Sequence, residues 1–267
     1  MAHLSAADTR VARRKFEKDA AKALAELAHV LMIDYLRGWN GATKENIRRA
    51  EKALKKAYTI HRSVVPLAHV AESKIREVKG DLEGSIESLD AALALDPGLA
   101  DAYAHKANAF ILLGEAEKAP ELLTKAIDLI RGQFPSELGL FHWFMGRAYF
   151  NMGAYFKSQG DDDQARDLLK ESIDSLKTSV GERDTTWFSW AHLISAYALT
   201  DRLEKPDADV QKAVNTYRAK FQKDWPLDKI KAYYKQPKYR SSVPQLQAAL
   251  DEYIHGLEIA NQKVKVP

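Results

Sequence analysis

The sequence predicts an all-α protein, an α-solenoid of antiparallel helix pairs with a capping helix at its C-terminal end. Two observations lead to this prediction. A segment repeats after 34 residues, and small and large apolar residues recur at helical spacing along the chain. Each pair in such an array packs only on its neighbours, so 267 residues need not form two separate cores.

The repeat is clearest in two consecutive segments, KGDLEGSIESLDAALALDPGLA and LGEAEKAPELLTKAIDLIRG. Gly80 and Gly114 are 34 residues apart, and so are Leu89 and Leu123. We expect two antiparallel helices in each unit, with small residues where the helices nearly touch. Pro120 falls in the first turn of its predicted helix, where its missing N–H does no harm.

Further helix pairs are predicted on both sides of these segments, which gives about five pairs in total. The apolar residues that define the outer pairs are Leu27, Val30, Leu31, Tyr35, Leu36, Ala50, Leu54, Ala57, Trp190, Leu193, Tyr197, Val210, Ala213 and Tyr217. Beyond the break at Trp225 and Pro226, a run from Leu246 to Leu257 again has helical spacing. We expect this run to form a capping helix, because an array must cover its last apolar face.

The pair that follows residue 139 contains an insertion. About seven additional residues separate Gly153 from Gly160, the two candidate turn glycines. Seven residues make nearly two helical turns, so they lengthen the first helix and keep its buried face aligned. We predict an overlong helix that ends at Gly160, followed by an N-cap within Asp161–Asp163. A cation-binding loop at these aspartates is not expected, because the alternating oxygen ligands and the distal glutamate are missing.

The predicted organisation has three regions. Residues 1–25 form an N-terminal helical extension, residues 26–221 form the array of about five pairs, and residues 222–267 form a C-terminal linker and the capping helix.

Residues from Tyr35 to Tyr217 resemble the tetratricopeptide repeat (TPR) family, and the segment 100–133 is the clearest match. The sequence departs from the family pattern at Lys106, where an apolar residue is usual, and at Ile194, where a glycine is usual. The resemblance implies a right-handed superhelix. It also implies that the first helices line a concave groove that binds a protein or peptide.

The resemblance further implies which residues contact the ligand, since the family uses fixed positions of each unit. In this sequence these positions are Lys74, His105, Asn108, Ile111, Trp143, Arg147, Phe150, Asn151, Phe188, His192 and Ser195. Trp143, Arg147 and Phe150 share a helical face, and tryptophan beside arginine is typical of interface hot spots. Aromatic residues at helical spacing also form cores, so this alternative interpretation stays open. A carboxylate clamp is not expected, because Ala104 stands where the clamp needs a lysine.

Three stretches are also similar to the repeat region that follows the catalytic domain of some bacterial class III adenylate cyclases. They are DYLRGWNGATKENIRRAEKALKKAY, LDAALALDPGLADAYAHKANAFILLG and LGLFHWFMGRAYF. No segment resembles a cyclase domain itself. This second resemblance therefore implies a sensor or regulatory role in signal transduction without cyclase activity.

Composition and motifs argue against several other classes of function. The 40 basic and 37 acidic residues are interleaved, whereas nucleic-acid binding favours a stripe of one sign. No cysteine is present, and the eight histidines are not at metal-ligand spacing. Neither a phosphate-binding loop nor a hydrolase motif occurs. We therefore expect no enzymatic activity, no cofactor and no metal.

The expected protein is soluble and cytoplasmic, because the chain has neither an apolar stretch of membrane-spanning length nor the apolar core of a secretory signal. The leading functional hypothesis is a peptide- or protein-binding scaffold. Two alternatives stay open. One is a structural protein that associates with itself as a homodimer, and the other is a sensor that binds a small molecule inside the curve of the array.

Overall fold

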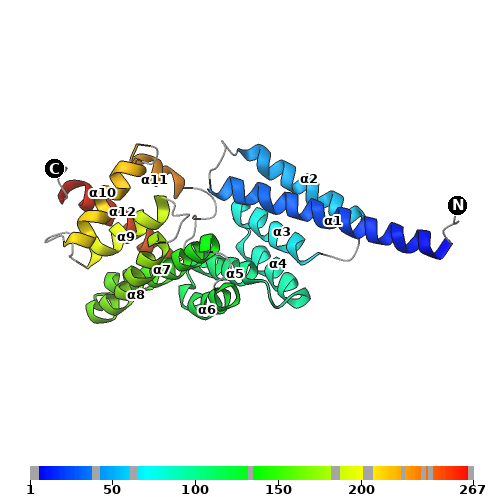
Figure 1. The fold of residues 1–267 in the computed structure, drawn as a ribbon. Coiled ribbons are helices and arrows are strands. Elements are labelled where there is room, and N and C mark those ends of the chain that lie inside the picture. The colour runs from blue at the N-terminus through cyan, green and yellow to red at the C-terminus, as the bar shows by residue number, and fades with distance from the viewer. Residues whose placement is uncertain are drawn as a thin grey trace. The chain divides into compact units, whose positions relative to one another are not determined.

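The computed structural model describes residues 6–37, 43–60, 65–131, 135–181, 187–200, 207–223, 226–235, 239 and 243–263. These residues form α-helices joined by short turns, and no strand occurs among them, so the predicted all-α class is confirmed (Figure 1). The chain separates into two compact units, residues 1–102 and 103–267.

Unit 1 consists of two antiparallel helix pairs and the first residues of a fifth helix. The helices are α1 (Ala6–Arg37), α2 (Lys44–Ile60), α3 (Pro66–Lys79), α4 (Leu82–Leu95) and α5 (Ala100–Leu113). Helix α1 packs on α2 and α3, and α3 packs on α4. The N-terminal turns of α1 extend past the end of α2 (Figure 1), and Phe16 on these turns is 74% exposed. The predicted boundary between residues 25 and 26 falls inside α1.

Small residues dominate the core of unit 1, as the sequence pattern requires for closely packed helices. Its fully buried positions include Ala25, Ala28, Met32, Ala50 and Ala71. Alanine side chains let helix backbones approach closely, and they lose no side-chain entropy on burial.

Unit 2 contains the remaining pairs. Its helices after α5 are a short 3₁₀ turn η2 (Ala116–Lys118), α6 (Ala119–Ile130), α7 (Pro135–Ser158), α8 (Asp162–Gly181), α9 (Trp187–Leu199), α10 (Ala208–Lys220), α11 (Leu227–Tyr233) and α12 (Pro244–Lys263). Pro120 lies in the first turn of α6, as predicted. Helices α7 and α8 form the most extensive pair, which two buried serine hydroxyls on α8 reinforce. Ser172 donates to the Gly146 carbonyl at 2.7 Å, and Ser179 donates to the Gly139 carbonyl at 2.8 Å.

The predicted overlong helix is confirmed. Helix α7 continues through Gly153 and ends at Ser158, close to the expected stop at Gly160. Gly160 has a φ of 81°, a left-handed conformation that favours glycine at a helix C-terminus. The Asp161 carboxylate then accepts a hydrogen bond from the Gln164 N–H at 3.1 Å, which makes Asp161 the N-cap of α8.

The predicted C-terminal helix is present as α12, and it covers more than the last pair. It packs along α9 and also along α7, the first helices of two successive pairs, and it contacts the short α11. In a repeat array the first helices face the inside of the curve. The C-terminal helix therefore lies on the face where a groove was predicted.

Candidate functional site: the inner wall of unit 2

Seven of the predicted contact residues form one connected surface across α5, α7 and α9. We call this surface the inner wall. It consists of Asn108, Trp143, Arg147, Phe150, Phe188, His192 and Ser195. Phe188 is half-buried, and the other six are buried. The sequence interval between these residues is large, so the stacking of the repeats brings them together.

Arg147 lies at the centre of the inner wall and is only 3% exposed. Its Nη1 donates a hydrogen bond to Asn108 Oδ1 at 2.9 Å. Its guanidinium carbon lies 5.7 Å from the ring centroids of both Trp143 and Tyr239, within the range of cation–π attraction. No carboxylate of the described residues pairs with Arg147, and Nη2 has no hydrogen-bond partner among them. Within the described part of the chain, the inner wall therefore holds a buried positive charge without a counter-ion.

Aromatic rings surround this charge and connect α7 to α9. The Trp143 ring lies 4.1 Å from the Phe188 ring and 5.8 Å from the His192 ring, centroid to centroid. His192 Nδ1 lies 2.8 Å from the Phe188 carbonyl oxygen. Trp143 Nε1 lies 3.4 Å from the same Nδ1, so Nδ1 either donates to the Phe188 carbonyl or accepts from the indole N–H, and the tautomer decides which. Burial first, and then the charge of Arg147, lower the pKa of His192 from 6.5 to about 3, so this imidazole is neutral at physiological pH.

Three tyrosines from the C-terminal segment cover the inner wall. Tyr253 on α12 places its ring 4.3 Å from the His192 ring and 6.3 Å from the Phe150 ring. Tyr234 lies 5.1 Å from Tyr253 and 4.7 Å from Tyr239, ring to ring. Burial raises the pKa of all three phenols, so they stay neutral well above physiological pH.

The backbone of α12 approaches α9 closely at one point. Ser195 Oγ lies 2.9 Å from the Tyr253 carbonyl oxygen and 3.0 Å from the Ala191 carbonyl oxygen, so its hydroxyl can donate to either. A methyl group added at Gly256 would lie 2.8 Å from the Ser195 Cα atom, closer than carbon atoms approach. Gly256 therefore permits the contact that brings the Tyr253 carbonyl within reach of Ser195.

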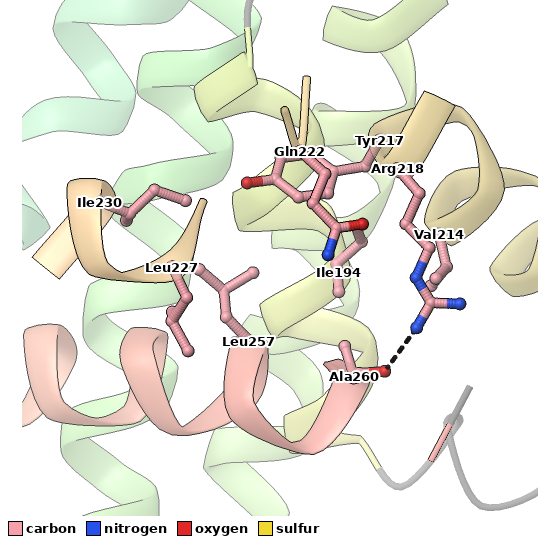
Figure 2. A pocket seen from close by; sticks show the side chains of 9 residues that line it. All are labelled: Ile194, Val214, Tyr217, Arg218, Gln222, Leu227, Ile230, Leu257 and Ala260. Atoms are coloured by element: carbon pink, nitrogen blue, oxygen red, sulfur yellow. Dashed lines mark hydrogen bonds between the residues drawn. The ribbon is translucent and has the colours of Figure 1, made fainter. Parts of the chain in front are cut away.

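The opposite flank of α12 faces α10 and α11 (Figure 2). Leu257 and Ala260 of α12 line a small cavity of about 30 Å³ together with Ile194, Val214, Tyr217, Arg218, Gln222, Leu227 and Ile230. Arg218 Nη2 donates to the Ala260 carbonyl at 3.4 Å, drawn as a dashed line in Figure 2, while its buried Nη1 has no hydrogen-bond partner among the described residues. An ion pair at 2.7 Å between Lys231 of α11 and Glu258 of α12 also joins these two helices.

The other predicted contact residues lie outside the inner wall. His105 packs edge-on against Phe144 with centroids 5.7 Å apart, and Ile111 is fully buried. Asn151 lines a cleft of about 510 Å³ at the start of α12. Lys74 belongs to unit 1, where it is 1% exposed and its Nζ lies 3.1 Å from the Asp101 carboxylate.

Sequence reasoning did not identify the residues that cover the inner wall. Tyr234 and Tyr239 fall in the stretch that was predicted to be a linker, and Gly256 was not singled out. The sequence nevertheless indicates that this stretch is buried, because three tyrosines within seven residues are unusual for an exposed linker. A glycine inside an apolar helical pattern likewise indicates a close approach of two backbones.

Two further properties of the described chain bear on function. No helix within the described ranges is long and apolar enough to cross a membrane. The same ranges contain no group of three histidine, aspartate or glutamate side chains that could hold a metal ion.

Comparisons with known proteins agree with this architecture. Residues 100–132 match the family model described as tetratricopeptide repeat, and this match coincides with the segment that the sequence pattern identified most clearly. No protein with a curated description matches the sequence. These comparisons do not show the similarity to class III adenylate cyclases.

Three solved structures are similar to the chain. A thermophilic TPR protein of Thermus thermophilus aligns with a TM-score of 0.50 at 16% identity, covering 81% of this chain and 98% of that one. Pseudomonas aeruginosa pilF aligns with a TM-score of 0.39 at 14% identity, covering 82% and 96%. The APC/C hetero-tetramer Cut9–Hcn1 aligns with a TM-score of 0.33 at 13% identity, covering 97% and 59%. The first of these similarities supports the TPR-type solenoid fold and nothing more specific.

Proposed function

We propose that this protein is a polypeptide-binding module that holds a helix of its partner on the inner wall of unit 2. Proteins built from tetratricopeptide repeats generally mediate protein–protein interactions, which gives the general class. The observation that carries the specific proposal is the placement of α12 along α7 and α9. The chain's own helix packs on the helices that the family resemblance predicts to line the ligand groove, so we take it as an internal example of a ligand.

The physical character of the inner wall supports this function. An amphipathic helix binds in a groove through side chains that repeat every three or four residues. Helix α12 has buried side chains at this spacing, namely Leu246, Ala249, Tyr253, Leu257 and Ala260, and among them Tyr253 contacts the inner wall. Tryptophan, tyrosine and arginine are also the residues that contribute most to protein interfaces, and the inner wall and its cover contain all three types.

A site-specific crosslink tests the proposal. A photoreactive benzoyl-phenylalanine replaces the half-buried Phe188 at the edge of the inner wall, and the purified full-length protein is irradiated in a lysate of the source organism. We expect a polypeptide to crosslink at this position. A synthetic peptide of residues 243–263, the sequence of α12, should reduce the crosslink when it is added in excess, because it competes for the same surface.

The same photoreactive residue at Leu129 serves as the control. Leu129 is exposed on α6, the second helix of its pair, away from the inner wall. Equal products from both positions, or products that the peptide does not reduce, would contradict the proposal.

A small-molecule sensor is the second candidate, favoured by the cleft that contains Asn151. A volume of about 510 Å³ is within the range of ligand-binding pockets, and Tyr155, Phe156, Glu115 and Glu117 offer both apolar and acidic walls. Binding of a metabolite there would raise the melting temperature of the protein. A metabolite screen that gives no shift would count against this candidate.

Self-association as a homodimer, a cytoplasmic location and a regulatory role near a class III adenylate cyclase stay predictions from the sequence. The absence of nucleic-acid and membrane binding also stays a prediction. Light scattering across a range of concentrations tests the homodimer, and a single monomeric mass at all concentrations would exclude it.

A further inference from the structure

The contacts of α12 show which features of a helix the inner wall accommodates. Tyr253 and Gly256 are three residues apart, so they lie on the same face of the helix. The Tyr253 ring contacts His192 and Phe150, and the Tyr253 carbonyl is within hydrogen-bond distance of Ser195 Oγ. Gly256 lies directly against the Ser195 backbone. One aromatic side chain and one missing side chain thus fix the depth at which the helix lies.

We infer that the inner wall recognises a partner helix by a tyrosine followed three residues later by a glycine, and that such a helix takes the place of α12. The inference rests on the proposed polypeptide-binding function and specifies its ligand. The tyrosine packs against the rings of His192 and Phe150. The glycine lets the helix backbone reach Ser195, whose hydroxyl then has the tyrosine carbonyl as an acceptor.

A partner helix can displace α12 because the C-terminal segment leaves buried hydrogen-bond donors unsatisfied. Beneath the C-terminal segment, the Nη2 group of Arg147 is buried without a hydrogen-bond partner among the described residues. On the other flank of α12, Nη1 of Arg218 is also buried without a hydrogen-bond partner among the described residues. It lies beside the cavity of about 30 Å³ that Figure 2 shows. A buried donor without a partner is unfavourable. A partner helix that offers acceptors to these groups therefore has an advantage over α12.

The covalent connection of α12 gives it the opposite advantage. A segment tethered to its binding site has an effective concentration on the order of millimolar. A free peptide with the same sequence therefore binds the wild-type protein only at similarly high concentration. The binding rule is best measured in a full-length variant in which α12 has left the inner wall.

The test uses the full chain with the substitution Gly256→Leu, which places a large side chain against Ser195. Hydrogen exchange should show that α12 loses protection, while circular dichroism should show that the other helices persist. The labelled peptide of residues 243–263 should then bind this variant much more tightly than the wild type in a fluorescence anisotropy titration. A peptide that carries Gly256→Leu should bind about 10- to 100-fold more weakly, as expected for overpacking. A Tyr253→Ala peptide should also bind more weakly.

The matched control is Gly181→Leu, because a Cβ atom added at the exposed Gly181 on α8 meets no atom within 4 Å. This variant should behave like the wild type. A second variant, Glu258→Lys, breaks the ion pair with Lys231 without adding bulk near Ser195, and it should give intermediate peptide binding. If the Gly256→Leu variant does not fold, the Glu258→Lys variant takes its place in the binding measurements.

The outcomes separate the inference from the proposed function. Equal binding of the wild-type, Gly256→Leu and Tyr253→Ala peptides would overturn the recognition rule and leave a groove that accepts any amphipathic helix. Undiminished protection of α12 in the Gly256→Leu variant would also overturn the rule. Loss of α12 protection without binding of any peptide would overturn the polypeptide-binding function itself.

Discussion

Both units bury a basic side chain, and the two charges are compensated in different ways. Lys74 of unit 1 lies 3.1 Å from the carboxylate of Asp101. Arg147 of unit 2 has the neutral amide of Asn108 and two aromatic rings instead. Taking an ion out of water costs several kcal/mol, and an ion pair recovers more of this than an amide does. The difference suggests that unit 1 is built for stability at this position, whereas unit 2 keeps a positive charge available on its inner wall.

The largest expected effect concerns acid, because burial and, second to it, the charge of Arg147 keep His192 neutral in the folded protein. In the folded protein the pKa of His192 is lowered to about 3, and the unfolded chain has its ordinary value of 6.5. The stabilisation is complete above pH 6.5 and is lost as the pH falls towards about 3, since only the unfolded state binds the proton in this range. The loss is on the order of 5 kcal/mol. In unit 1, the pKa of Glu72 is lowered from 4.5 to about 2, mainly by its hydrogen bond with His69, so the contribution of Glu72 to stability is lost only below pH 4.5.

As the pH is lowered, unit 2 should therefore begin to lose stability at a higher pH than unit 1. Tryptophan fluorescence during denaturant unfolding at a series of pH values measures this, because Trp143, Trp187 and Trp190 all belong to unit 2. The His192→Phe variant keeps a ring and removes the titration, so its midpoint should change little between pH 6.5 and about 3. A wild type and variant with parallel pH profiles would contradict the argument.

The next effect concerns the ion pair in unit 1. Replacing one partner of a fully buried pair destabilises by about 3–5 kcal/mol. Asp101 is 31% exposed, so we expect a smaller loss of about 2 kcal/mol for Asp101→Asn. Hydrogen exchange of the α3 amides around Lys74 measures the loss. Lys74→Met should be milder, because it leaves the carboxylate at a partly hydrated position rather than an ammonium in the core. The reverse order of the two variants would show that Asp101 does not compensate Lys74.

The sequence predicted the fold well because helix pairing is a local property. The spacing of small and large apolar residues indicated which faces are buried, and the interval between Gly153 and Gly160 indicated the length of α7. The same periodicity placed Trp143, Arg147 and Phe150 on one face. These features depend on residues within about two helical turns of each other, so they can be predicted from the amino-acid sequence alone.

The cover of the inner wall could not be predicted in the same way. The apolar face of α12 shows that this helix must be buried, but the face does not indicate the surface against which it packs. The proximity of Tyr253 to His192 joins residues that are 61 positions apart, and it depends on how the C-terminal segment turns back. The pair of Lys74 and Asp101 likewise depends on the stacking of successive repeats, which the charges alone do not reveal.

The smallest expected effect on stability belongs to Arg147→Met. The variant loses the hydrogen bond to Asn108 and the cation–π contacts, but it also removes a buried charge that no described carboxylate pairs with, and a methionine fills a similar volume. These contributions oppose each other, so the midpoint of denaturant unfolding at neutral pH should change by no more than about 1 kcal/mol. A loss of about 3 kcal/mol would show that the guanidinium is a structural requirement. The acid response should change in one direction: without the neighbouring charge the pKa of His192 rises in part, while burial, the larger cause, still keeps it below 6.5, so unit 2 of the variant should lose somewhat less stability in acid than the wild type. Arg147→Ala, which leaves a cavity as well, should lose stability at every pH and thus separate the effect of packing from that of charge.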